Sequence, residues 1–412
     1  MKIRKIAAGL LSVLLLGAIP APAFAASAAV TTAPQAVKVS YADIESIVRS
    51  SNQTIRANGK TLDSLKGNDA AEKKQDEIAA GRKQLQDLSS QLQLTYQSIA
   101  GSPDQKALKD ALNGSIASLN AICSILKGQE DQLDISDDTI DQTELQMDEA
   151  ADQIVVAAQK LYVTFHSLDA ERRQLTRQKK ALDDTLKIEQ LKADLGLITQ
   201  ADLLNAQQQK NTLGDNLTAL VNQMEAVKNN LRVLLGYSDA YDVSLSSMPE
   251  PEGDFAAKMD EEKDRQTAQD ENWTLKEKKL AKEIADDNKD SDLDSTVDDF
   301  RAASLNYSLV LNTFHASFQQ VYSDVAGKQG KLASAQAAYD AKAKAFAAVE
   351  QQNALGVASA LDLENAQMNL DSAEAALDQA KIGLFSSQEQ YRWALRGVIS
   401  TSSAQSQSAA QG

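Results

Sequence analysis

The stretch Leu-Gly-Leu-Ile-Thr-Gln-Ala-Asp-Leu-Leu-Asn-Ala-Gln at residues 195–207 returns at residues 355–367 as Leu-Gly-Val-Ala-Ser-Ala-Leu-Asp-Leu-Glu-Asn-Ala-Gln. Seven of the 13 positions are identical at an ungapped offset of 160 residues. The same offset pairs Tyr162 with Tyr322 and Leu235 with Leu395, so the agreement extends over more than 70 residues without a gap. Such self-similarity at a fixed offset indicates an internal duplication.

The repeated stretch has the residues of a tight turn between two helices. Gly196 and Gly356 can adopt the positive φ with which many helices end. Thr199 and Ser359 follow three residues later and can cap the next helix. The sequence therefore predicts one helix–turn–helix unit in each copy.

The flanking segments have the periodicity of long helices. Apolar residues recur at alternating spacings of three and four over 203–234 in the first copy and over 363–394 in the second, where many are alanine. At 1.5 Å per residue, the ascending segment 148–194 would be about 70 Å long and the descending segment 199–235 about 55 Å. A helix pair this long cannot form a core alone, so its apolar face must be buried against the other copy or another chain.

Composition supports an all-α fold and excludes several functions. Aromatic residues make up 5% of the chain, and no proline lies between Asp104 and Met248 or after Glu252. The 58 acidic and 42 basic side chains give a net charge of −16, which argues against nucleic acid as a partner. Because the sequence contains no G-x-S-x-G motif, no H-E-x-x-H motif, no Walker loop and no Cys/His pair, we expect neither an enzyme nor a cofactor.

The first residues have the pattern of a secretory signal peptide. Three positive charges precede the apolar run 6–19, and Ala-Phe-Ala at 23–25 is a cleavage site. The protein is therefore expected to be exported. The single cysteine, Cys123, lies in an apolar helical stretch and is interpreted as a small buried side chain.

These signals give a domain plan of a signal peptide at 1–25, a first helical repeat at 40–237, a linker at 238–264, a second helical repeat at 265–398 and a disordered tail at 399–412. Within the repeats, further helices are expected at 41–65, 70–100, 105–133 and 258–285. The fold class is all-α, with duplicated long antiparallel hairpins and little or no β-structure.

Metal binding is not expected. His166 and His315 each lie within a predicted helix, with no histidine or cysteine at ligand spacing. The acidic run 286–299 lacks the glycine and the final glutamate of an EF-hand loop. We interpret this run as a solvated face or loop.

Exported, duplicated hairpins with two copies of this turn resemble the TolC family of outer-membrane efflux proteins, over about 250 of the 412 residues. The residues that carry the resemblance are 195–207, 355–367 and Leu-Leu-Gly at 234–236. The resemblance implies a homotrimeric tube with an α-helical barrel and a membrane β-barrel. It also implies docking to an adaptor protein, which connects the tube to an inner or cytoplasmic-membrane pump.

The sequence departs from the family in one region. The family places a β-hairpin before the ascending helix of each copy. The corresponding region here, 66–145, is rich in Gln, Asp, Lys and Ala and has no alternating apolar run of strand length. We therefore expect the helical hairpins to be present and these strands to be missing.

The resemblance also assigns candidate sites. The adaptor-docking tips would comprise Gly196, Leu197 and Thr199 in the first copy, and Gly356, Val357 and Ser359 in the second. The alternative is that these residues only end one helix and cap the next.

Asp202 and Asp362 match an acidic position that lines the tunnel entrance in the family, while Asn365 replaces the family's second acidic residue. The alternative is that each aspartate stabilises the first turn of its helix through the helix dipole.

Two functions remain open from the sequence. One is a TolC-like efflux or secretion duct, a passive channel component in the cell envelope. It would lie in the outer membrane and periplasm of a diderm cell, or at the surface of a monoderm cell. The other is an exported coiled-coil scaffold of the envelope or a regulator of a wall hydrolase.

Overall fold

The computed structural model describes residues 35–66, 72–99, 106–127, 137–291 and 293–399. The first part of the chain forms β1 Gln35–Val39, α1 Tyr41–Ser51, α2 Gln53–Lys66, α3 Glu72–Ser98, α4 Lys106–Lys127, α5 Asp137–Asp194 and α6 Gln200–Leu234. The second part forms β2 Tyr241–Leu245, α7 Phe255–Lys258, α8 Glu261–Glu271, α9 Trp273–Asp287, α10 Asp294–Ala354 and α11 Ala360–Leu395. The predicted signal peptide and nearly all of the predicted tail lie outside the described residues.

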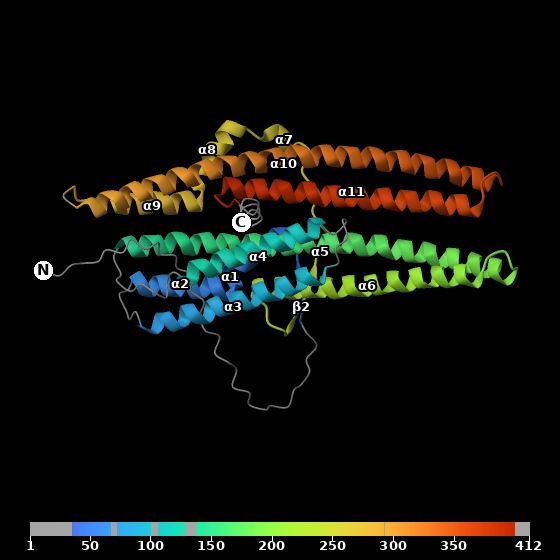
Figure 1. Ribbon diagram of the computed structural model, residues 1–412, viewed down its shortest axis with the longest axis horizontal. Helices are drawn as coiled ribbons and strands as arrows, with labels where there is room; N and C mark the ends of the chain where they lie inside the picture. The colour runs from blue at the N-terminus through green and yellow to red at the C-terminus, as the bar shows by residue number, and fades with distance from the viewer. Residues whose placement is uncertain (1–34, 67–71, 100–105, 128–136, 292, 400–412) are drawn as a thin grey trace, which may run out of the picture.

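The predicted all-α fold with duplicated long hairpins is confirmed. Helix α5 has 58 residues and α10 has 61, and each turns back into an antiparallel partner, α6 or α11 (Figure 1). The two hairpins run side by side, and both turns lie at the same end of the molecule (Figure 1). Helix α5 begins at Asp137, eleven residues earlier than the sequence indicated.

Each copy begins with two short helices that are separated by a break at an asparagine. Asn52 separates α1 from α2, and Asn272 separates α8 from α9. The two breaks share the pattern Asn-x-Thr-[Ile/Leu], at 52–55 and 272–275, with an offset of 220 residues rather than 160. The first copy therefore has about 60 extra residues between its short helices and α5, and this is where α3 and α4 lie.

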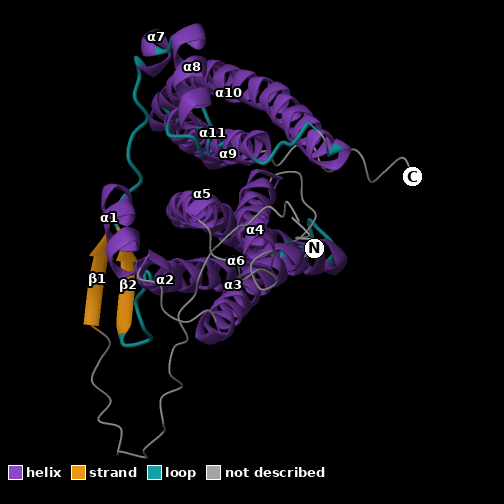
Figure 2. Cartoon of the chain, turned by 90° about the vertical axis from the view of Figure 1, so that its left-hand side faces the viewer, coloured by secondary structure: helices purple, strands orange, loops and turns teal. Residues whose placement is uncertain are grey.

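Helices α3 and α4 form an additional hairpin that packs on α5. The apolar side of α4, including Leu112, Leu119, Ile122 and Leu126, is almost completely buried. The described residues of 66–145 are thus overwhelmingly helical, as expected for the region that lacks the family's strand pattern. Figure 2 shows α4 on one side of α5, with α1 and the two strands on the opposite side.

Both hairpins are held at their base by an asparagine and a glycine. The side chain of Asn52 donates a hydrogen bond to the carbonyl of Leu234 (2.8 Å), and that of Asn272 donates to the carbonyl of Gly397 (3.0 Å). Gly236 and Gly397 end the descending helices with φ of 76° and 91°. The break between the short helices therefore fixes the end of the long hairpin in each copy.

The segment 238–264 holds more structure than a linker. Strand β2 pairs with β1 in parallel, with Val37 opposite Val243. Val243 and Phe255 are buried, so this segment packs on the cores of both copies rather than only connecting them.

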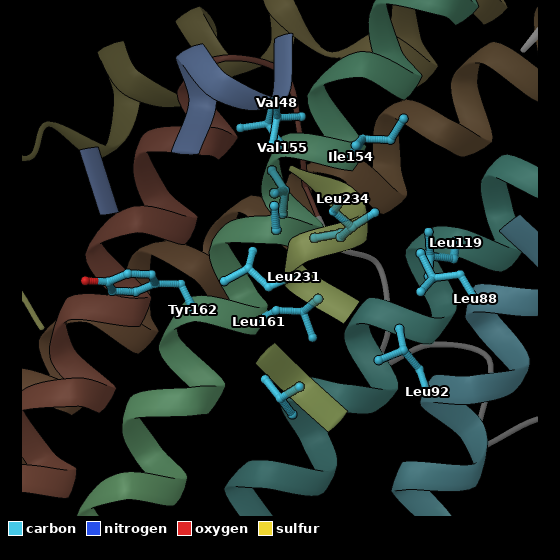
Figure 3. Close-up of a cluster of buried hydrophobic side chains, with 14 of the residues drawn as sticks. Val48, Leu88, Leu92, Leu119, Ile154, Val155, Leu161, Tyr162, Leu231 and Leu234 are labelled. Atoms are coloured by element: carbon cyan, nitrogen blue, oxygen red, sulfur yellow. The ribbon is translucent and has the colours of Figure 1, made fainter. Parts of the chain in front are cut away.

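The main core lies in the first copy, where α1, α3, α4, α5 and α6 converge (Figure 3). Val155, Leu161 and Leu231 are fully enclosed there. Cys123 belongs to the same core, as predicted, and its burial raises the pKa of the thiol to about 11. A smaller cluster around Phe318 and Tyr391 fills the second copy.

Among the described helices, none combines the length and the apolar character that crossing a membrane requires.

Candidate functional site: the hairpin tips

The two turns that carry the repeated sequence lie at the far end of the hairpins and have the same backbone geometry. Gly196 has φ of 71° and Gly356 has φ of 74°. The next amide closes each helix end: Leu197 N donates to Lys192 O, and Val357 N donates to Gln352 O, both at 2.8 Å. A Cβ added at either glycine would meet no atom within 4 Å, so glycine is required for its φ and not for space.

A reciprocal capping box starts the descending helix in each copy. The Thr199 hydroxyl accepts from Asp202 N (3.2 Å), while Thr199 N donates to Asp202 Oδ2 (3.0 Å). Ser359 and Asp362 make the same pair of bonds at 3.2 and 2.9 Å. The predicted caps are therefore present, and they extend to the aspartate three residues later.

The capping boxes give Asp202 and Asp362 a structural role. In each, Oδ2 also accepts a hydrogen bond from the capping hydroxyl at 2.7 Å. Bonds from the hydroxyl and from the backbone amide lower the pKa of both carboxyls. These aspartates hold their own turns together, and a role at a tunnel entrance stays a prediction.

Large apolar side chains project from both tips into solvent. Leu195 and Leu197 are 66% and 70% exposed, and Leu355 and Val357 are 79% and 76% exposed. The sequence indicated Leu197 and Val357 but not the two leucines before the glycines. Their signal was available, because leucine stands at this position in both copies. Four exposed apolar residues at one end of the molecule are typical of a protein contact surface.

The two tips differ in the hydrogen bonds that stabilise their turns. In the second tip, Asn353 donates its side-chain amide to the carbonyl of Ala358 at 3.0 Å. Ala193 takes the equivalent place in the first tip and cannot make this bond. The second turn also has a backbone hydrogen bond from Ala358 N to Gln352 O at 3.2 Å, for which the first turn has no counterpart.

Between tips and base, the two hairpins contact each other along a surface that we call the intra-chain seam. Both tryptophans of the second copy donate their indole N–H to α5: Trp273 to Asp152 (3.1 Å) and Trp393 to Gln159 (2.6 Å). Nearer the tips, polar side chains of α5 pair with α11: Ser167 with Gln379 at 3.0 Å, Arg173 with Asp378 at 3.2 Å, and Arg177 with Glu374 and, at 3.6 Å, with Asp371.

The histidines have ordinary polar or aromatic neighbours. His315 Nε2 lies 3.1 Å from Gln269 Oε1 and 3.3 Å from the Arg265 guanidinium, and the His166 ring packs on Tyr162. Within the described ranges, His, Cys, Asp and Glu side chains form no group of three or more that could hold a metal ion.

Comparisons with known proteins give similarity in structure only. No family model matches the chain, and no curated protein matches it. Among solved structures, the CmeC outer membrane channel of Campylobacter jejuni has 10% identity and a TM-score of 0.46, with 90% of this chain and 88% of CmeC covered.

Two further structures give similar values. For the outer-membrane channel OprN, the identity is 13% and the TM-score 0.48, with 87% of this chain and 90% of OprN covered. For a membrane protein from Pseudomonas aeruginosa, the values are 12% and 0.46, with 87% and 91% covered. The chain is similar in shape to these proteins, and its function is proposed from its own residues.

Proposed function

We propose that this protein is the passive duct component of an efflux or secretion system in the cell envelope, and that its hairpin tips dock onto an adaptor protein. The observation that carries the proposal is the pair of matched tips. Leu195, Leu197, Leu355 and Val357 are exposed together at one end of two parallel hairpins. A partner that covers them would gain the free energy of apolar burial, about 25 cal/mol per Å².

The shape of the hairpins supports a tube rather than a self-contained domain. Towards the tips each hairpin is only two helices thick, and Leu191, Leu204 and Leu361 are exposed along it. Such a hairpin needs further hairpins beside it to bury its apolar face. Three copies of the chain would supply six hairpins and could close a ring around a central channel.

In this proposal the chain supplies a path and no energy. A pump in the inner or cytoplasmic membrane would drive transport, and the adaptor would connect the pump to the tips. Docking would then depend on apolar contact at Leu197 and Val357, with the capping boxes of Thr199 and Ser359 keeping each turn in shape.

The test is a binding measurement between the purified mature chain and the purified extracytoplasmic part of an adaptor from the same organism. The double variant Leu197→Glu, Val357→Glu should weaken binding at least tenfold, because it places charges in an apolar contact. The control, Leu94→Glu, changes an exposed leucine of α3 away from the tips and should bind like the wild type. Equal binding by all three proteins would refute docking at the tips.

The helical insertion α3–α4 favours a second candidate, an exported coiled-coil scaffold or regulator of a wall hydrolase. In the first copy this hairpin lies where the TolC family has strands. If the mature chain were a monomer that binds no adaptor but activates a wall hydrolase, the second candidate would replace the first.

A further inference from the structure

The α3–α4 hairpin lies on the face of α5 that is opposite α1 and the strands. Tyr162 and Lys160 show this at one level of α5, because residues two apart lie about 200° apart around a helix. The Tyr162 ring contacts that of Tyr41 in α1, with centroids 5.7 Å apart. On the other side, a Cβ built on Gly114 of α4 would lie 3.5 Å from Lys160 Nζ. The long hairpins therefore carry different elements on their two faces.

The two faces differ in how much chain they carry. One carries α3 and α4, which together are about 20 Å wide. The other carries α1, both strands and the segment 246–254 that leads from β2 to α7 (Figure 2). This segment crosses the intra-chain seam, because Tyr162 donates to Ser246 O and Gln388 donates to Glu252 O, both at 2.7 Å. At about 10 Å for a helix and about 5 Å for a strand or extended segment, this face carries about 25 Å of chain.

The geometry of a ring decides which face can point inward. Three chains have twelve long helices, which at a spacing of about 10 Å form a ring with a radius of about 19 Å. A layer packed inside this ring at the same spacing has a radius of about 9 Å and a circumference of about 57 Å. Three α3–α4 hairpins need about 60 Å, whereas three copies of the opposite face need about 75 Å. The α3–α4 face therefore fits the interior, and the opposite face is too wide for it.

The part of the hairpin that would line the channel carries no charge. Residues 88–98 of α3 and 111–126 of α4 contain no Asp, Glu, Lys or Arg, in a chain with 24% charged residues. The two segments pack on each other, since the Ser89 hydroxyl donates to Asn120 Oδ1 at 2.6 Å. Over its segment, α4 exposes small or polar side chains: Asn113, Ala117, Asn120, Ala121 and Ser124.

Resting on the proposed duct, we propose that the α3–α4 hairpin lies inside the channel, where three copies form a neck that passes small hydrophilic molecules and excludes folded proteins. An inner layer of radius about 9 Å, less a helix radius of about 5 Å, leaves an opening about 8 Å across. A folded domain of about 100 residues has a radius of gyration of about 13 Å and cannot pass. Because the lining is polar and uncharged, the neck selects by width and not by charge.

Thiol cross-linking tests which face points inward. Ala117→Cys adds a thiol to α4 and Ala42→Cys adds one to α1, and both alanines are exposed in the single chain. In the trimer, the thiols at 117 would lie about 10–15 Å apart across the neck, whereas those at 42 would be more than about 40 Å apart. A short bismaleimide should therefore give covalent dimers of Ala117→Cys on a denaturing gel and none of Ala42→Cys. The wild type, in which the native Cys123 is buried, is the blank.

Labelling with maleimides of increasing size measures the width of the neck. N-ethylmaleimide should label both variants in the trimer. A polyethylene glycol maleimide wider than the neck should label Ala117→Cys at least tenfold more slowly than Ala42→Cys. In urea the two rates should be equal, because the difference arises from assembly and not from the thiols themselves.

The outcomes separate this proposal from the duct itself. If light scattering shows a trimer in which Ala117→Cys does not cross-link, or is labelled by the large maleimide as fast as Ala42→Cys, the neck is wrong and the duct stands. Cross-linking of Ala42→Cys would show that the opposite face points inward, which also overturns the neck. A chain that stays a monomer with and without the adaptor would overturn both proposals.

Discussion

At the scale of single residues, the base of each hairpin depends on a glycine that no other residue can replace. A Cβ built on Gly236 would lie 2.2 Å from the carbonyl oxygen of Ser51, and one on Gly397 would lie 2.0 Å from that of Glu271. Both glycines also have positive φ. Contact with the backbone of the short helices and the left-handed conformation therefore act together at these two positions.

We predict that Gly236→Ala and Gly397→Ala each lower the free energy of unfolding by about 2–4 kcal/mol, because left-handed strain of roughly 1–2 kcal/mol adds to a backbone clash. Urea unfolding followed by helix content measures this. The tip variants Gly196→Ala and Gly356→Ala should cost only the strain, about 1–2 kcal/mol. Similar losses at base and tip would contradict the close approach at the base.

The residue scale also shows why the turn was predictable. Gly196, Thr199 and Asp202 each act through local backbone geometry, so the sequence alone predicted the cap and the break. Exposure at Leu195 and Leu355 depends on what lies around the tip, and the local sequence does not specify that. The asparagine break at Asn52 was missed because helical residues continue on both sides of it.

At the scale of elements, α5 meets α9 through two carboxylates that lie close together. Burial, with a smaller contribution from the nearby charge of Glu277, raises the pKa of Glu149 from 4.5 to about 7, and a hydrogen bond from Gln153 opposes the shift. The folded chain therefore keeps a proton on Glu149 in a pH range where the unfolded chain has lost it.

It follows that the contribution of Glu149 to stability should fall as pH rises from 4.5 to 7, because at this group the unfolded state binds fewer protons in this window. We predict that Glu149→Gln is more stable than the wild type at pH 8, by about 1–3 kcal/mol. The difference should disappear near pH 4.5. Urea unfolding at both pH values measures it, and Glu350→Gln, an exposed position on α10, is the control. A pH-independent difference would refute the buried carboxyl.

Element lengths were predictable where periodicity is strong and less so where packing decides. The heptad pattern of α6 and α11 gave helix ends within a residue or two of Leu234 and Leu395. The short strands β1 and β2 were not predicted, because each is only five residues long and gains its partner from a distant segment.

At the scale of the whole molecule, the two tryptophans report on how the copies are joined. Trp273 and Trp393 both lie in the second copy and bond to α5 of the first, at positions two helical turns apart. Their fluorescence therefore depends on whether the copies stay together.

We predict that the fluorescence of Trp273→Phe and of Trp393→Phe, each with one tryptophan left, shifts in the same urea range in which helix is lost. The reason is that α5 and α6 lack a complete core without the second copy. Each variant should also be less stable by about 1–2 kcal/mol, because a hydrogen bond that is partly buried at Trp273 and buried at Trp393 is removed. A fluorescence change that precedes the loss of helix would show that the copies separate first.

The duplication of the long hairpins was the most predictive signal at this scale. The insertion that holds α3 and α4 in the first copy was the feature that the sequence predicted least well. An offset of 160 relates the long hairpins, whereas an offset of 220 relates the asparagine breaks. The extra α3–α4 hairpin hides the second offset from a search without gaps.

The pairing of β1 with β2 has a consequence for the order of folding. The register joins Gln35 to Tyr241, residues that are about 200 positions apart. A chain is made from its N-terminus, so β1 remains without its partner until the whole first hairpin and β2 have been synthesised. In the folded chain the strand pair joins the two ends of the first copy. A chain that stops before Tyr241 would therefore leave β1 without its partner.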